Sequence, residues 1–102
     1  MKLIKVMIGD AEVDLSDVNE SWINQQINRR RQDGIEVCVQ VKINQDDLNM
    51  VLSTPTCQNT AGAHRAPNNH ERRLFELWNK MGLNSHGFSS GNLIAFLKQL
   101  PL

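Results

Sequence analysis

Residues 35–43 read Ile35-Glu36-Val37-Cys38-Val39-Gln40-Val41-Lys42-Ile43, and apolar and polar side chains alternate along the whole stretch. Successive side chains of a β-strand point to opposite faces of the sheet, so this alternation predicts a strand with one buried face and one mostly solvated face. The apolar positions are all Val or Ile, which pack well on a pleated surface. A strand of this kind needs partners, and the fold follows from where they are found.

Two shorter alternating segments, residues 2–8 and 11–15, precede it. Gly9-Asp10 lies between them, and a glycine at such a point favours the tight turn of a two-residue hairpin. The first fifteen residues therefore predict a β-hairpin.

A helix is predicted between this hairpin and the main strand by four apolar residues at helical spacing: Val18, Trp22, Ile23 and Ile27. Asp17 and Glu20 are three residues apart and predict a capping box at its start. Gly34 suits the left-handed conformation that ends helices.

The resulting order, strand–strand–helix–strand, resembles the opening of the β-grasp fold, in which a hairpin and a following strand curl around one helix. The resemblance implies an α+β fold. After the main strand, residues 44–47 are expected to cap a short helix carrying Leu48, Val51 and Leu52, so no final strand is expected.

The chain is expected to divide into an α+β unit (1–52), a polar linker or mobile loop (53–67) and a C-terminal two-helix segment (68–102). The linker lacks large apolar side chains and periodicity. In the last part, Asn68 with Glu71 predicts a capping box, Gly82 predicts the end of that helix, and Ser89 or Ser90 predicts the start of a second helix. Two amphipathic helices are too small to fold alone, so they are expected to dock on the first unit or on a partner.

Bulk composition excludes several classes of protein. The 102 residues carry 11 Lys+Arg and 11 Asp+Glu, a formal net charge of +0, so total charge gives no reason to expect a nucleic-acid or membrane-surface protein. No apolar stretch is long enough to span a bilayer, and no secretory signal pattern stands at the start. The expectation is a soluble cytoplasmic protein that does not bind membranes.

Two cysteines, Cys38 and Cys57, are too few for a disulfide scaffold and are expected to be free thiols in a reducing compartment. Cys57, His64 and His70 loosely suggest a zinc site, with Cys38 and His86 as the other soft ligands. Structural zinc sites usually pair two cysteines two to four residues apart, so no metal is expected. A Cys57 thiolate paired with His64 or His70 would need a rigid support that this segment does not provide. We therefore expect no catalytic residue, no cofactor and no enzymatic activity.

Six arginines remain as candidate binding residues: Arg29, Arg30, Arg31, Arg65, Arg72 and Arg73. On one common face they would follow a phosphate backbone. The segment 77–87 followed by 93–97 also resembles the helix–extended-loop–helix of SAP and LEM modules, which implies DNA binding. It has Ser90 and Gly91 where those modules place a lysine. The competing explanation for Arg29–Arg31 is that cations favour the C-terminal end of a helix.

The leading hypothesis is a small non-enzymatic accessory or protein-interaction protein with a protein partner or self-association, because no catalytic set, cofactor cradle or metal motif is present. A hairpin leaves at least one sheet edge, and partners often bind such edges by adding a strand. The alternative is a nucleic-acid-binding module that uses the arginines.

Overall fold

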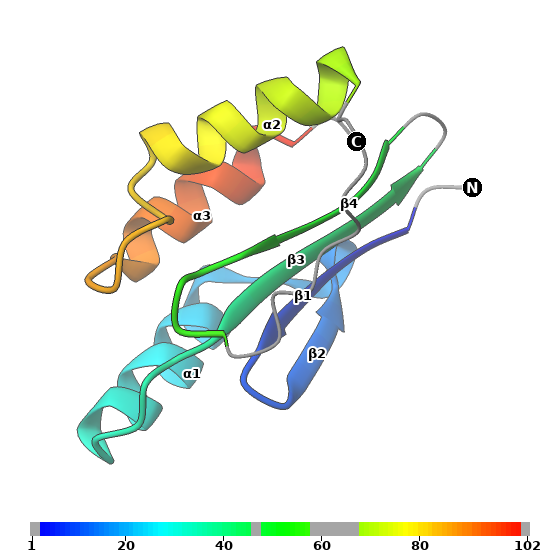
Figure 1. The fold of residues 1–102 in the computed structure, drawn as a ribbon. Helices are drawn as coiled ribbons and strands as arrows, with labels where there is room; N and C mark the ends of the chain where they lie inside the picture. Colours follow the sequence, from blue (N-terminus) through cyan, green and yellow to red (C-terminus); the bar gives the residue numbers. More distant parts are fainter. Residues whose placement is uncertain (1–2, 46–47, 58–67, 101–102) are drawn as a thin grey trace.

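The computed structural model describes residues 3–45, 48–57 and 68–100. These residues form an α+β fold (Figure 1), with one antiparallel sheet in the strand order β2-β1-β3-β4. The strands are β1 (Leu3–Ile8), β2 (Ala11–Asp14), β3 (Val39–Gln45) and β4 (Leu48–Ser53). The helices are a short 3-10 turn (Leu15–Asp17), α1 (Glu20–Gln32), α2 (Asn69–Lys80) and α3 (Ser90–Lys98). The predicted fold class and the order strand–strand–helix–strand are confirmed.

The sheet has one covered face and one open face. Residues of one parity on β1 and β3 are buried, among them Val6 and Val41, which are cross-strand partners and 0% exposed. Residues of the other parity, such as Lys42, are exposed or half-buried. The buried residues of α1, α2 and α3 belong to the same core cluster as these strand residues. Because side chains alternate between the two faces of a sheet, all three helices therefore cover the same face.

The C-terminal helices share this core with the sheet. Trp78 of α2 is 1% exposed and packs edge-on against Phe96 of α3, with 5.2 Å between ring centroids. Ser90 Oγ donates a 2.6 Å hydrogen bond to Asn24 Oδ1, and Lys98 pairs with Glu20. α3 therefore lies antiparallel along α1, and the core is continuous from the N-terminal strands to α3.

Most helix boundaries follow the predicted signals. The Asn68–Glu71 capping box is present, Ser89 accepts from the backbone N–H of Asn92, and Gly82 ends α2 at φ 75°. Gly34 ends α1 at φ 74°. The predicted start of α1 is wrong. The N-cap is Asn19 and not Asp17, and the Asn19 side chain accepts from Trp22 N at 2.7 Å. Asp17 belongs to the preceding 3-10 turn.

The main strand is shorter at its start than its alternation predicts. β3 begins at Val39, and Ile35, predicted to be in the core, is 54% exposed. The physical reason is pairing, since β1 turns away at Gly9 and the last pair of its register is Ile8 with Val39. Before Val39, the backbone N–H of Gly9 still donates to Cys38 O at 2.9 Å, and Val37 is 3% exposed, so the alternation holds back to Val37. Ile35 and Glu36 lie beyond the end of β1 and are exposed.

The short helix predicted over residues 48–52 is also wrong, because this segment is strand β4. Leu48 and Leu52 are buried, whereas Asn49 and Val51 are exposed, which is period 2 and not helical spacing. Each buried residue pairs with a residue of β3, so burial against a ready-made strand outweighs the weak capping signal.

The predicted linker begins later than expected. Ser53 ends β4, Thr54 is 0% exposed and Cys57 is 6% exposed. The rest of the predicted linker, residues 58–67, lies outside the described residues. Within the described part of the chain, no helix is long and apolar enough to cross a membrane.

Candidate functional site

The candidate arginines that the structure describes do not lie together. Arg29–Arg31 occupy the last turn of α1 and Arg72 and Arg73 the first turns of α2, at opposite ends of the molecule (Figure 1). Arg65 lies outside the described residues. The structure therefore does not join the two described clusters into one surface that could follow a single phosphate backbone.

Two of the arginines hold the fold. Arg30 donates to Asp10 Oδ1 at 3.0 Å and to Gln26 Oε1 at 2.7 Å, which fastens α1 to the β1–β2 turn. The guanidinium of Arg31 lies over the Phe88 ring and donates to its backbone carbonyl. Arg29 is exposed. Two of these three arginines, Arg30 and Arg31, therefore make contacts that stabilise the fold.

The outer edge of β4 is a different kind of surface. Val39 turns its backbone N–H and C=O toward β4, since its N–H donates to Thr54 Oγ1 and its C=O accepts from Thr54 N. Backbone groups in an antiparallel pair alternate in direction. By the register of β3 and β4, the N–H and C=O groups of Asn49, Val51 and Ser53 point away from the sheet.

One end of this edge is closed by α2. The buried Glu71 carboxylate accepts from the backbone N–H of Asn49 at 3.4 Å and also caps α2 through Asn68 N. Among the described residues, no strand pairs with the outer side of β4, so Val51 and Ser53 present unpaired strand edge.

Two of the large hydrophobic side chains exposed in the described chain flank this edge. Val51 is 52% exposed and lies on the open face of the sheet. Phe75 is 50% exposed and follows Glu71 by four residues, so it lies one turn further along the same side of α2. In Figure 1, α2 runs above β4 in the same direction. The unpaired edge therefore has an apolar side chain on each side of it.

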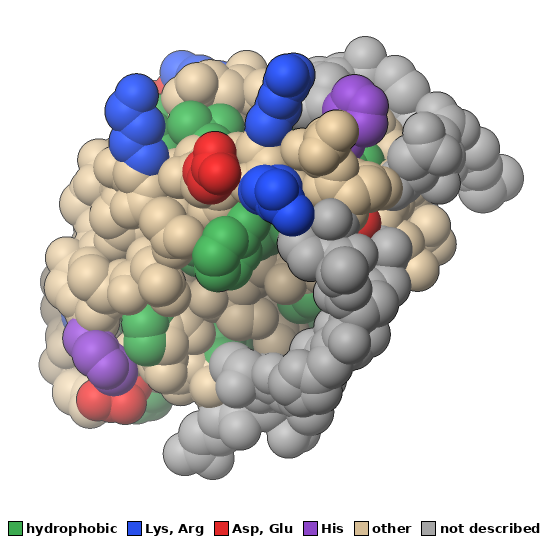
Figure 2. Space-filling model, turned by 45° about the horizontal axis from the view of Figure 1, so that its top comes forward, with side chains coloured by type: hydrophobic (Ala, Val, Ile, Leu, Met, Phe, Trp, Pro, Cys, Tyr) green, Lys and Arg blue, Asp and Glu red, His purple; other side chains and the backbone are tan. Residues whose placement is uncertain are grey.

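Charged side chains accompany Phe75. The exposed charged residues of α2 are Arg72, Arg73, Glu76 and Lys80, three cations and one carboxylate. Figure 2, which brings the top of Figure 1 forward, shows Lys or Arg, Asp or Glu and hydrophobic side chains next to one another on this face. Lys42, the cross-strand neighbour of Val51, adds a cation on the open face. The surroundings of the edge are apolar and net positive.

The other edge strand, β2, is protected. It is only four residues long, and Glu12 and Asp14 alternate along it as exposed carboxylates. Glu12 also pairs with Lys5 at 3.3 Å. Short length and charge are the usual means by which an edge avoids strand addition. β4 lacks these features at Val51 and Ser53.

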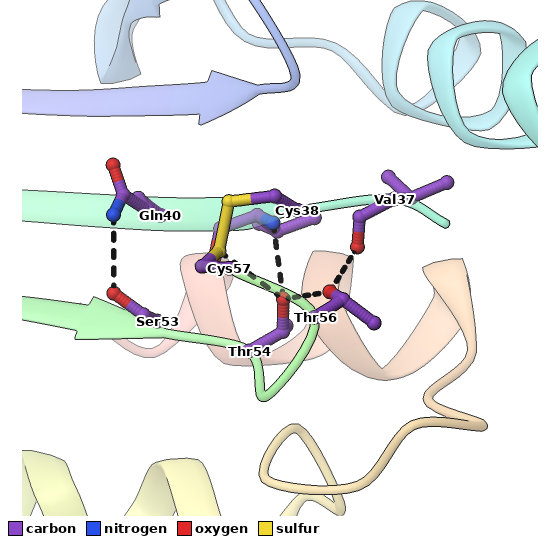
Figure 3. The surroundings of a disulfide bond; sticks show 8 residues. Val37, Cys38, Gln40, Ser53, Thr54, Thr56 and Cys57 are labelled. Atoms are coloured by element: carbon purple, nitrogen blue, oxygen red, sulfur yellow. Dashed lines mark hydrogen bonds between the residues drawn. A yellow bond between two sulfur atoms is a disulfide. The ribbon is translucent and has the colours of Figure 1, made fainter. Parts of the chain in front are cut away.

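The cysteines correct the sequence expectation. Cys38 and Cys57 form a disulfide, with their Cα atoms 4.7 Å apart (Figure 3), and are not free thiols. The unexpected strand β4 explains this, because its pairing with β3 brings residues 54–57 back to the start of β3. The backbone N–H of Cys57 donates to Thr54 O at 3.1 Å, closing the turn that presents its sulfur to Cys38.

A chain of hydroxyls holds the same corner (Figure 3). Val39 N–H donates to Thr54 Oγ1 at 3.1 Å, the two threonine hydroxyls lie 2.8 Å apart, and Thr56 Oγ1 donates to Val37 O. Each hydroxyl has one proton, so Thr54 donates to Thr56. Pro55 has no N–H to pair, and these hydroxyls continue the contact between the two segments beyond the backbone bond from Thr54 N to Val39 O.

The residues considered for metal or nucleophilic chemistry are not assembled in the described chain. Both cysteine sulfurs are bonded to each other, and a disulfide offers no thiolate. His70 and His86 are exposed, on α2 and in the α2–α3 connection. His64 lies outside the described residues. Over the described part of the chain, no three His, Cys, Asp or Glu side chains are grouped as metal ligands would be.

Comparisons with known proteins give no family or relative. No family model matches the chain, and neither a curated protein nor a solved structure is significantly similar to it. The geometry of the chain itself is therefore the basis for the function proposed below.

Proposed function

We propose that this protein is a non-enzymatic interaction protein that binds an extended segment of a partner protein along the outer edge of β4. The proposal rests on the outer backbone groups of Val51 and Ser53, with which no other described strand pairs, and on the exposed apolar side chains of Val51 and Phe75 beside them. A partner strand would pair with these backbone groups and place alternate side chains against the two apolar residues.

Charge indicates what kind of segment fits. Arg72 lies on the same side of α2 as Phe75, and Lys42 is the cross-strand neighbour of Val51, so a segment that alternates apolar and acidic residues is complementary to the edge. A second copy of this chain fits less well. An isologous β4–β4 pair would bring two net-positive α2 helices to the same side of the joined sheet.

The test is a selection of short displayed peptides against the protein, followed by binding measurements on two variants. Val51→Pro removes the outward N–H, and because Val51 does not pair with β3 through its backbone, the sheet stays intact. Val51→Ala keeps the N–H and is the matched control. We expect apolar–acidic peptides that bind the wild type, bind Val51→Ala more weakly because its side chain is shortened, and do not bind Val51→Pro because the outward N–H is also lost.

Two results would overturn the proposal. Selected peptides that bind Val51→Pro as tightly as wild type would show that β4 is not the binding edge. A concentration-dependent dimer in light scattering, lost in Val51→Pro, would replace the partner segment with a second copy.

Nucleic-acid binding is the second candidate, and one observation favours it: the exposed Phe75 ring beside Arg72 offers a stacking surface next to a phosphate contact. It predicts a gel shift with single-stranded DNA or RNA at low salt that disappears in the double variant Arg72→Ala/Arg73→Ala. The equivalent change at Arg29 should leave that shift unchanged.

A cytoplasmic location remains part of the proposal and is tested by cell fractionation. Disulfides in cytoplasmic proteins are usually transient or redox-sensing and not permanent staples. A cytoplasmic location therefore predicts that the Cys38–Cys57 bond forms and breaks reversibly.

A further inference from the structure

We propose that Cys38–Cys57 is a dithiol–disulfide exchange site that controls binding at the edge of β4. The control of binding rests on the function proposed above, whereas the exchange chemistry stands independently. The chain contains only these two cysteines, and they are bonded to each other across the end of the β3–β4 pair.

The two sulfurs differ in access. Cys57 is 6% exposed, whereas Cys38 is half-buried and lies on the parity of β3 that faces the open side of the sheet. A thiolate must approach the sulfur that it attacks, so Cys38 is the target and Cys57 the leaving sulfur.

The surroundings of Cys57 suit a leaving thiolate. Thr54 Oγ1 lies 3.6 Å from Cys57 Sγ, within reach of a hydroxyl–sulfur hydrogen bond. In the disulfide form this hydroxyl donates to Thr56 Oγ1. When the bond breaks, the Thr54 hydroxyl can turn to the new thiolate, because an anionic acceptor makes the stronger hydrogen bond.

The reaction balances with a dithiol reductant. One reductant thiolate attacks Cys38 Sγ, the Cys38–Cys57 bond breaks, and Cys57 leaves as a thiolate that takes up a proton. The second reductant thiol, as its thiolate, then attacks the reductant sulfur of the mixed disulfide and releases Cys38, which is protonated in turn. The protein gains two electrons and two protons, and the reductant leaves as a disulfide.

The bond acts on binding through the end of β4. It ties the turn after β4 to the start of β3, four residues beyond Ser53, and so fixes the backbone groups of Ser53 that point outward. Without it, this corner depends on Thr54, Thr56 and the 3.4 Å contact between Gln40 Nε2 and Ser53 Oγ. A less ordered edge binds a strand more weakly, because the entropy lost in ordering it reduces the free energy of binding. We expect the reduced protein to bind about tenfold more weakly.

The first experiment tests the exchange site alone. The purified protein is treated briefly with glutathione, remaining thiols are alkylated, and the mixed disulfide is mapped by mass spectrometry. We expect glutathione mainly on Cys38 and alkyl on Cys57. Glutathione mainly on Cys57, or a bond untouched until the protein is unfolded by urea, would overturn the exchange site.

The second experiment tests the control of binding. The peptides selected above are titrated against the oxidised protein, the protein reduced with dithiothreitol, and the double variant Cys38→Ser/Cys57→Ser, each checked for folding by circular dichroism. We expect the reduced protein and the variant to bind about tenfold more weakly than the oxidised protein. Equal binding by all three proteins would refute the proposal that the disulfide regulates binding, but it would leave the proposed binding function in place. If no peptide depends on Val51, the proposed function itself fails, and the glutathione result still decides the exchange site.

Discussion

The guanidinium carbon of Arg31 lies 4.9 Å from the centre of the Phe88 ring, and Arg31 Nη2 donates a 2.7 Å hydrogen bond to the carbonyl oxygen of Phe88. One side chain thus fastens the end of α1 to the connection between α2 and α3, residues 57 positions apart in the chain. Arg31, one of the three consecutive arginines, therefore stabilises the fold.

Arg31→Ala should therefore lower stability. A cation–π contact at a partly exposed site and one hydrogen bond together are worth roughly 1–2 kcal/mol, so urea unfolding should show a loss of that order. Arg29→Ala removes the same charge two residues earlier, where Arg29 is exposed, and is the matched control. Equal losses in the two variants would show that the effect is one of charge alone.

Gly9→Ala should also destabilise the protein. Gly9 has φ +63°, a conformation that costs an L-residue about 1 kcal/mol, and a Cβ there would lie 2.6 Å from Arg30 Nε. Gly34 has φ +74° with nothing within 4 Å of such a Cβ. Gly34→Ala therefore measures the backbone strain alone. We expect Gly9→Ala to cost about 1 kcal/mol more, because the Arg30 side chain must move.

An equal free-energy loss in the two glycine variants would mean that Arg30 adjusts freely. In that case its contacts with Asp10 and Gln26 contribute little to holding α1 on the hairpin. Thermal unfolding followed by circular dichroism is sufficient to distinguish the two results.

Much of the fold was predictable because its signals are local. The helix ends at Gly34 and Gly82, the capping box at Asn68 and the cap at Ser89 depend on a few neighbouring residues, and all of these were predicted correctly. The cap of α1 was missed because Asp17 and Asn19 both suit the role. Which one is used depends on how the chain leaves β2.

What the sequence could not show depends on pairing between distant residues. Residues 48–53 contain three consecutive apolar residues (50–52), so their hydrophobicity has no clear period, and only pairing with β3 makes the segment a strand. Recognising β4 would also have placed residues 54–57 opposite the start of β3 and brought Cys57 within reach of Cys38. The disulfide and the exposed edge were therefore both missed because strand β4 was not predicted.

Thr54→Val should be costly for its size. Thr54 is 0% exposed and its hydroxyl accepts from the backbone N–H of Val39. Valine keeps the shape and leaves that buried donor unpaired, which costs about 1–3 kcal/mol. Thr54→Ser keeps the hydroxyl and should cost less. Unfolding in urea with the disulfide intact is the measurement, and a Val variant as stable as the Ser variant would contradict the role given to the hydroxyl chain.

Phe75 separates binding from folding. Its ring is 50% exposed, so Phe75→Ala should change the free energy of unfolding by less than about 1 kcal/mol. Its neighbour Leu74 is 8% exposed in the core, and Leu74→Ala should cost about 2–5 kcal/mol.

Isothermal titration with a selected peptide should show the reverse order for affinity. Losing the ring should weaken binding about tenfold, because a truncated aromatic contact at an interface costs more than about 1 kcal/mol. Leu74→Ala, measured where it is still folded, should bind nearly as wild type. If Phe75→Ala binds normally, α2 does not flank the bound segment, and the apolar contact is restricted to Val51 on the open face of the sheet.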